Sequence, residues 1–99
     1  MQRGGTVYIM TNKNFSVYYV GVTSDLPSRV IQHKTKWYPN SFTARYNADV
    51  LVYFEAYSTI VEAIAREKQL KKYSRMKKRT LINQFNPAWT DLFEHIKEW

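Results

Sequence analysis

The 99-residue chain contains no cysteine, only two histidines and only three glycines. The absence of cysteine excludes disulfides, zinc sites built on thiolates and thiol nucleophiles. Two histidines are too few for most metal cages built on imidazole. No run of about 18 apolar residues is present, so we expect no membrane span. The N-terminus does not resemble a signal peptide. We therefore expect one domain, residues 1–99, in the cytoplasm.

Negative charge is scarce as well. Eight Asp and Glu residues stand against fifteen Lys and Arg, which gives a formal net charge of +7. A field of that sign favours polyanions, and nucleic acid is the commonest polyanion in a cell. The alternative is a charged, solvated surface with no partner. Composition supports nucleic acid as the partner but does not distinguish DNA from RNA.

The apolar pattern of the first third of the chain predicts a hairpin and then a helix. Residues 6–10 and 16–22 are strand-like runs separated by a polar turn, as in an antiparallel hairpin. Asp25 is a good N-cap, and Pro27 fits the first turn of a helix. We therefore predict a helix over about residues 26–36, directly after the second strand.

The rest of the chain predicts one more strand and three more helices. Residues 37–48 have no apolar period and are predicted to form a loop. Residues 49–57 are almost continuously apolar, as expected for a strand covered on both faces. The predicted helices are residues 60–73, capped by Ser58 or Thr59, a helix after Ser74, and a last one opened by Asn86 and Pro87 with Trp89, Leu92, Phe93 and Ile96 inward. The order β-β-α-β-α-α-α indicates an α/β domain of the α+β type, a small sheet covered by helices.

Glu67 is the first candidate for chemistry. It falls on the apolar stripe of the helix predicted over residues 60–73. A carboxylate in that position costs free energy unless it is paired or binds a cation. The two interpretations are a metal ligand and an ion pair with a basic residue such as Lys71 or Arg29.

Arg29 and His33 are the second candidate. They are four residues apart and lie side by side on one face of a helix. Neither is a core residue by preference. An arginine can extend from the helix edge to solvent, which is the simpler interpretation. The alternative is an arginine that binds a phosphate beside a histidine that relays protons.

Basic residues gather around the junction of the second and third predicted helices. Such a run is either a solvated face or a contact with a phosphate backbone. Six basic residues of the chain are candidates for nucleic-acid binding: Lys34, Arg45, Lys68, Lys71, Lys72 and Lys78.

Two stretches, residues 6–10 and 18–34, resemble the GIY-YIG nuclease domain. The region from residue 51 onward is similar to the small single-domain bacterial branch of that family, the UPF0213 or YhbQ-like proteins. The resemblance covers residues 6–92. It implies a three-stranded antiparallel sheet flanked by helices and an endonuclease that depends on Mg²⁺ or Mn²⁺. It implies DNA rather than RNA as the substrate, in branched, flapped or single-stranded form, with a role in repair or recombination. We expect a monomer or weak dimer.

The resemblance also implies roles for single residues. The positions that match the family's motifs are Tyr8, Tyr19, Arg29, His33, Glu67 and Asn86. Glu67 would bind the metal, Arg29 would stabilise charge on the phosphoryl group, and Tyr8 would act as general base. Tyr19 and His33 would orient water or phosphate. Val22 stands where some family members carry a lysine, so a mechanism assisted by that lysine is not expected.

Two other functions compete with a nuclease. A non-catalytic nucleic-acid-binding domain would keep the fold and the basic surface, and its binding would depend on salt but not on metal. A protein-interaction module would dock a partner or a second copy through the aromatic tail, residues 89–99.

Overall fold

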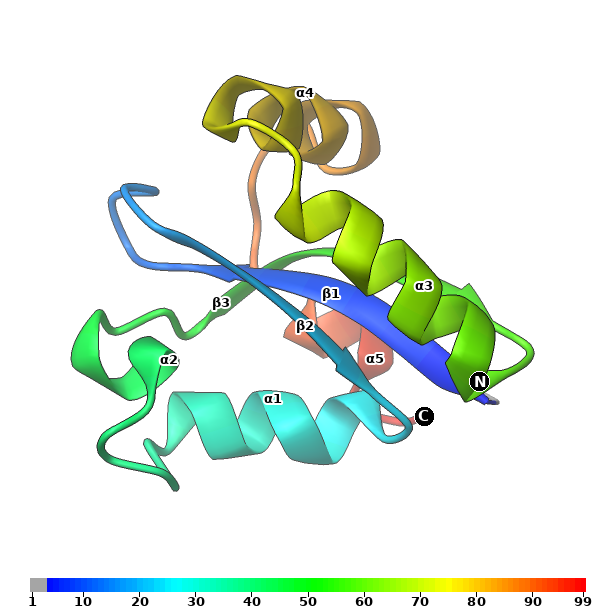
Figure 1. Cartoon of the computed structure of the whole chain (residues 1–99). Helices are drawn as coiled ribbons and strands as arrows, with labels where there is room; N and C mark the ends of the chain where they lie inside the picture. The colour runs from blue at the N-terminus through cyan, green and yellow to red at the C-terminus, as the bar shows by residue number, and fades with distance from the viewer. Residues whose placement is uncertain (1–3) are drawn as a thin grey trace.

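The structure is a computed structural model that describes residues 4–99 (Figure 1). Its centre is a three-stranded antiparallel sheet in the order β2-β1-β3. The strands are β1 (Gly5–Thr11), β2 (Tyr18–Thr23) and β3 (Val50–Tyr57). The predicted hairpin is therefore confirmed as β1 and β2. β2 and β3 form the two edges of the sheet.

Five helices surround the sheet: α1 (Leu26–Lys34), α2 (Phe42–Arg45), α3 (Ile60–Lys71), α4 (Arg75–Phe85) and α5 (Phe93–Ile96). The predicted fold, a small antiparallel sheet flanked by helices in the order β-β-α-β-α-α-α, is confirmed. One short helix, α2, lies inside the segment that was predicted as loop. No helix within residues 4–99 is both long enough and apolar enough to span a bilayer.

The helices cover both faces of the sheet. Figure 1 shows α3 and α4 on one side and α1 and α5 on the other. Successive residues of β1 point to opposite faces, so the central strand supplies two apolar clusters. The cluster on the α3 side contains Val7, Ile9, Val20, Val52, Tyr53, Ala63, Leu70 and Ile82. The cluster on the α1 side contains Tyr8, Met10, Leu26, Val30, Ala48, Leu51, Leu92 and Ile96.

A β-bulge interrupts the pairing of β1 with β3. Ile9 pairs with Tyr53, but Met10 pairs with Leu51, so Val52 is an extra residue on β3. The bulge lets Val52 and Tyr53 join the same apolar cluster although they are neighbours in sequence. It accounts for the nearly continuous apolar run that predicted a strand covered on both faces.

The predicted helix starts agree with the caps. The Asp25 carboxylate accepts hydrogen bonds from the Ser28 amide, at 3.3 Å, and the Ser28 hydroxyl, at 2.8 Å. Thr59, and not Ser58, caps α3: its hydroxyl accepts from the Glu62 amide at 3.2 Å. α1 ends two residues before the predicted boundary, because Lys36 adopts a positive φ of 55° that no α-helix continues.

The predicted last helix is present as α5, but its predicted start at Asn86 and Pro87 is wrong. Asn86 is the C-cap of α4, and the chain then runs without helix until Phe93. Trp89 has a positive φ of 54°, which a helix through this segment would not allow. Of the positions predicted to face inward, Leu92 and Ile96 are buried, whereas Trp89 and Phe93 are half-buried. The N-cap pattern of Asn-Pro was outweighed by the side-chain bonds that Asn86 makes.

Candidate active site

Gly21 allows a tyrosine side chain to cross the edge strand. Tyr8 of β1 pairs directly with Gly21 of β2, and its ring lies over that glycine. A Cβ atom on Gly21 would lie 2.5 Å from both Cζ and the hydroxyl oxygen of Tyr8, far inside van der Waals contact. Because β2 is an edge strand, the Tyr8 hydroxyl is carried toward the rim of the sheet, where helices from both faces can approach.

The Tyr8 hydroxyl begins a chain of buried hydrogen bonds. It lies 2.7 Å from Nε2 of His33 on α1. The other ring nitrogen, Nδ1, lies 2.8 Å from the Thr43 hydroxyl on α2. All three side chains are buried. Both ring nitrogens of His33 are thus engaged, and a neutral imidazole satisfies this arrangement with one donor and one acceptor.

Burial shifts the pKa values of Tyr8 and His33 in opposite directions. Burial, and next the nearby Tyr19, raise the pKa of Tyr8 well above its ordinary value. Burial, assisted by the positive charge of Arg29, lowers the pKa of His33 to about 4. At neutral pH the tyrosine is therefore protonated and the histidine is neutral. The predicted role of Tyr8 as general base consequently needs a group that takes the tyrosine's proton, and His33 is in contact with it.

Tyr19 and Arg29 complete this side of the cluster. The Tyr19 ring centroid lies 6.3 Å from that of Tyr8 and 5.3 Å from that of His33. Burial acts to lower the pKa of Arg29, but its interactions with the Tyr8 and Tyr19 hydroxyls hold the pKa above the ordinary value. Its Nη1 also donates to Oε1 of Gln32 at 2.9 Å. A permanent positive charge thus lies beside two tyrosine hydroxyls.

Glu67 reaches the same cluster from the other face of the sheet. α3 packs against β1 and β2, and the negative charge of Glu67 is felt at the Tyr8 hydroxyl. Its side chain is only 15% exposed and its carboxylate forms an ion pair with Lys71 at 3.2 Å. The expected ion pair is therefore present, within one helix. Lys71 is 54% exposed, so the pairing is solvent-accessible and weak.

The donor set around Glu67 is small. Within residues 4–99, no three His, Cys, Asp or Glu side chains gather in a way that could hold a metal ion. Mg²⁺ nevertheless keeps several of its waters and commonly binds proteins through one or two carboxylates and a substrate phosphate. A single, largely buried carboxylate whose protein partner is one exposed lysine fits that mode of binding.

Asn86 has a structural position. Its amide nitrogen donates to the carbonyls of Val52, at 3.2 Å, and Thr90, at 2.9 Å. Its amide oxygen accepts from the backbone and hydroxyl of Thr90, both at 3.3 Å. The side chain is buried and ties the end of α4 to β3 and to the segment that follows. These contacts are to the fold and not to the tyrosine cluster, so the expected catalytic role of Asn86 has no support in the geometry.

The six basic residues predicted to bind phosphates differ in their exposure and in whether they already pair with an acidic residue. Arg45, Lys68 and Lys72 are exposed, and Lys78 is half-buried. Lys71 pairs with Glu67. Lys34 has a structural role instead, since its ammonium forms an ion pair with Asp91 and donates to the Asp49 carbonyl at 2.8 Å.

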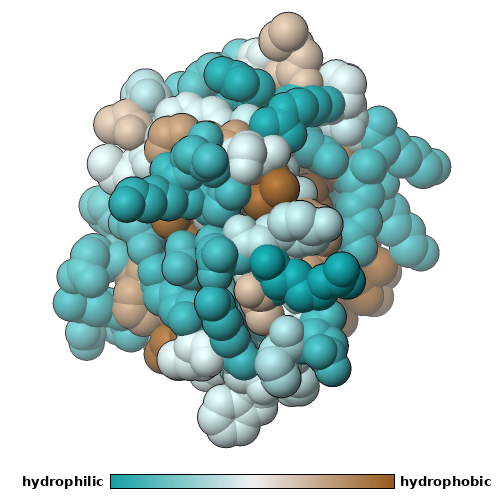
Figure 2. Space-filling model, turned by 90° about the vertical axis from the view of Figure 1, so that its left-hand side faces the viewer, coloured by the Kyte–Doolittle hydropathy of each residue, from teal (hydrophilic) through white to brown (hydrophobic). Residues whose placement is uncertain are grey.

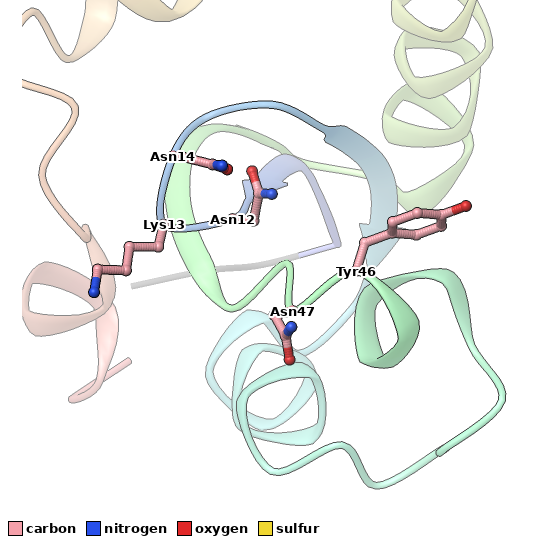
Figure 3. Close-up of a pocket in the computed structure, with 5 residues that line it drawn as sticks. All are labelled: Asn12, Lys13, Asn14, Tyr46 and Asn47. Atoms are coloured by element: carbon pink, nitrogen blue, oxygen red, sulfur yellow. The ribbon is translucent and has the colours of Figure 1, made fainter.

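A polar cavity of about 440 Å³ lies apart from this cluster, beside the β1–β2 turn (Figure 3). It is lined by Asn12, Lys13, Asn14, Tyr46 and Asn47. The amide of Asn12 already bonds Ser16 and Val17, and Asn14 accepts from the Ser16 hydroxyl. In Figure 3 the side chains of Lys13 and Tyr46 extend away from the middle of the cavity. Its polar groups serve the turn and offer no chemistry.

The sequence did not predict the place of two residues in the site, Gly21 and Thr43. The sequence gives no sign of the role of Gly21, because the residue that it accommodates lies on another strand. Thr43 lay in the segment predicted as loop. Its position follows from α2, which is capped by Ser41: the Ser41 hydroxyl accepts from the Ala44 amide at 3.3 Å. A Ser N-cap in residues 37–48 was the available signal for that helical turn.

Comparisons with known proteins indicate one family. The family model described as the GIY-YIG catalytic domain matches residues 4–86. A UPF0213 protein of Staphylococcus saprophyticus is 35% identical over 82 residues, which cover 79% of this chain and 93% of the relative. A UPF0213 protein of Staphylococcus aureus is 36% identical over 78 residues, with the same coverage of 79% and 93%.

A solved structure is also similar. The solution NMR structure of a UPF0213 protein from Bacillus halodurans superposes with a TM-score of 0.55 at 28% identity and covers 88% of this chain and 90% of that one. The match of the family model, the relatives and the fold lead to one conclusion. The chain belongs to the GIY-YIG family of nuclease domains, in its small UPF0213 branch.

Proposed function

We propose that this protein is a divalent-metal-dependent endonuclease that hydrolyses phosphodiester bonds in DNA. The observation that carries the proposal is the convergence of Tyr8, Tyr19, Arg29 and His33 at the β2 edge, within electrostatic reach of Glu67. These side chains come from two strands and two helices on opposite faces of the sheet. A purely structural role would not require a buried histidine, an arginine and a carboxylate at one rim.

The residues divide the chemistry of hydrolysis among them. Arg29 carries the charge that stabilises the additional negative charge of the phosphoryl transition state. The Tyr8 hydroxyl accepts a proton from the attacking water while its own proton passes to Nε2 of His33, which is neutral at physiological pH. Thr43 holds the far ring nitrogen of His33, and Tyr19 packs on the imidazole and fixes its plane. When bound at Glu67, a divalent ion would polarise the phosphate and assist the leaving oxygen.

The proposal is tested with a cleavage assay on labelled oligonucleotides. Branched, flapped, single-stranded and duplex DNA, and RNA of the same sequences, are incubated with Mg²⁺, with Mn²⁺ and with EDTA. We expect cleavage of DNA with either metal and none with EDTA. Arg29→Ala should reduce the rate by on the order of a hundredfold, as the loss of one preorganised charge does elsewhere.

Binding measured in the same samples separates the alternatives. If the protein binds DNA in a salt-dependent way but cuts nothing with either metal, the domain is a non-catalytic binding module. If it cuts RNA and leaves DNA intact, the substrate assignment is wrong although the site assignment stands.

A further inference from the structure

Four large aromatic side chains lie exposed between α1 and β3. Trp37, Tyr38, Phe42 and Tyr46 are 67%, 52%, 40% and 47% exposed. Single exposed apolar residues are ordinary, but a group of aromatics on one short segment is typical of a binding site. We call these four residues the aromatic surface. Figure 2 views the molecule from the side on which α2 lies in Figure 1, and there pale and brown residues lie interspersed with teal ones.

The aromatic surface is continuous with the candidate active site. The Phe42 ring stacks on Tyr19, with centroids 6.0 Å apart and planes inclined by 27°. Phe42 also packs on Tyr46, with centroids 4.7 Å apart. On the other side, the guanidinium carbon of Arg29 lies 5.6 Å from the centre of the Tyr38 ring. The aromatic surface therefore begins at two residues of the site, Tyr19 and Arg29.

The helical turn of α2 holds the surface in place. Thr43 and Ala44 face the interior and are buried, so Phe42 and Tyr46, four residues apart, share the outer side of the turn. Thr43 is also the residue that bonds His33. The same short helix thus anchors the hydrogen-bond chain from inside and presents flat aromatic rings outside.

The positive charge and the exposed aromatic rings of this surface favour one class of ligand. Arg29 lies over the Tyr38 ring, and Arg45 is exposed on the same short helix as Phe42. The chain carries a net charge of +7, which favours a polyanion over an apolar protein segment. Bases of a duplex are stacked on each other and do not present their faces to a protein, whereas unpaired bases do. Alternating cations and exposed aromatic rings are the arrangement by which proteins hold single strands without reading their sequence.

We propose that the aromatic surface stacks unpaired bases of single-stranded DNA next to the phosphate held at Arg29. The proposal rests on the proposed function for the nature of the substrate. It adds that Phe42, Tyr46, Tyr38 and Trp37 give the protein its preference for unpaired over paired DNA. That preference arises from binding and does not need the metal.

The test is the affinity of the whole protein for a fluorescent oligothymidine of about 15 nucleotides, measured by anisotropy in EDTA. Trp37→Leu and Tyr46→Leu keep an apolar side chain but remove the stacking ring. Each should weaken binding by about tenfold, the usual effect of losing one base–aromatic stack. Affinity for a duplex of equal length should not change. Phe85→Leu on α4 is the matched control, since Phe85 is 46% exposed but packs on Tyr53 and Phe54.

The outcomes separate this proposal from the proposed function, because binding in EDTA requires no cleavage. Weaker binding of oligothymidine by the two variants alone supports the aromatic surface, even for a domain that cuts nothing. Equal weakening on single strand and duplex, or no weakening on either, overturns it. A change in sedimentation of the variants without a change in DNA affinity also overturns it, because the rings would then serve self-association.

Discussion

Gly21 is the residue on which the geometry of the site depends most directly. It has no side chain, so the Tyr8 ring can cross the edge strand and meet His33. The glycine at this position therefore has a steric reason that is independent of turns. Pairing of Tyr8 with Gly21 is set by the hairpin register, which the sequence leaves open because several registers bury the same apolar residues.

Gly21→Ala should displace the Tyr8 ring, since the new Cβ would lie 2.5 Å from it. We expect a loss of about 1–3 kcal/mol in the free energy of unfolding, as for other overpacked sites. Urea denaturation measures the loss. Tyr8→Ala removes the ring, so in that background Gly21→Ala should cost almost nothing. Equal costs in both backgrounds would show that the ring is not what Gly21 accommodates.

His33 should make stability depend on pH. Its pKa is about 4 in the folded chain and 6.5 in the unfolded chain, so the unfolded state binds more protons between those values. The neutral His33 ring therefore makes its full contribution to stability above pH 6.5, and this contribution is lost as the pH falls toward 4. Between pH 7.5 and pH 4.5, the free energy of unfolding of the native protein should fall by about 2–3 kcal/mol more than that of His33→Gln, because glutamine does not titrate. Parallel stability profiles of the two proteins would contradict a buried neutral imidazole.

At the scale of elements, the sequence predicts regular segments well and irregular ones poorly. The hairpin, α1, β3, α3 and α4 follow from periodicity and from caps such as Asp25 and Thr59, which act within a few residues. The segment after α4 does not, because Asn86 bonds a strand 34 residues away. The predicted apolar stripe of α3 is buried at Ala63 and Leu70, on either side of Glu67 in the sequence, whereas Ile60 and Ile64 are exposed. How near Glu67 lies to Tyr8 depends on how α3 packs on the sheet.

Asn86 should matter for folding and not for chemistry. Asn86→Ala leaves the buried carbonyl of Val52 and the part-buried carbonyl of Thr90 without their donor, which should cost about 2–3 kcal/mol. Asn83→Ala is the matched control. Exposed Asn83 accepts a hydrogen bond from the indole N–H of half-buried Trp89, and its loss should cost under about 1 kcal/mol. Thermal unfolding and cleavage per folded molecule are measured together. A stable Asn86→Ala protein that no longer cleaves would restore a catalytic role.

At the scale of the whole molecule, only some of the basic residues behind the net charge of +7 are free to contact DNA. The count of basic residues follows from the sequence, but their pairing does not. Lys34 forms an ion pair with Asp91, which lies 57 residues further along the chain, whereas Lys68 and Lys72 remain exposed. Pairing of this kind depends on tertiary structure. For that reason the sequence predicted more phosphate-binding residues than the structure leaves free of an acidic partner.

DNA affinity should therefore respond differently to these lysines. Lys68→Ala and Lys72→Ala should each flatten the dependence of log Kd on log salt by about 0.7, the value for one lost phosphate contact on a single strand. Lys34→Ala should lower stability and leave the salt dependence unchanged. Anisotropy titrations from 50 to 200 mM salt, the range in which such contacts are measured, distinguish the two. A flatter slope for Lys34→Ala would place Lys34 on the DNA instead.

The central claim is that the edge cluster around Tyr8 is a metal-dependent phosphodiesterase site completed by Glu67. Its most direct test compares cleavage by Glu67→Gln with cleavage by Glu94→Gln at saturating Mg²⁺. Each glutamate pairs with a lysine three or four residues later in the chain, but only the charge of Glu67 acts on Tyr8. We expect Glu67→Gln to bind DNA at least as tightly as the native protein and to cut it at least about a hundredfold more slowly, while Glu94→Gln cuts normally. Equal cleavage by the two variants would contradict the claim.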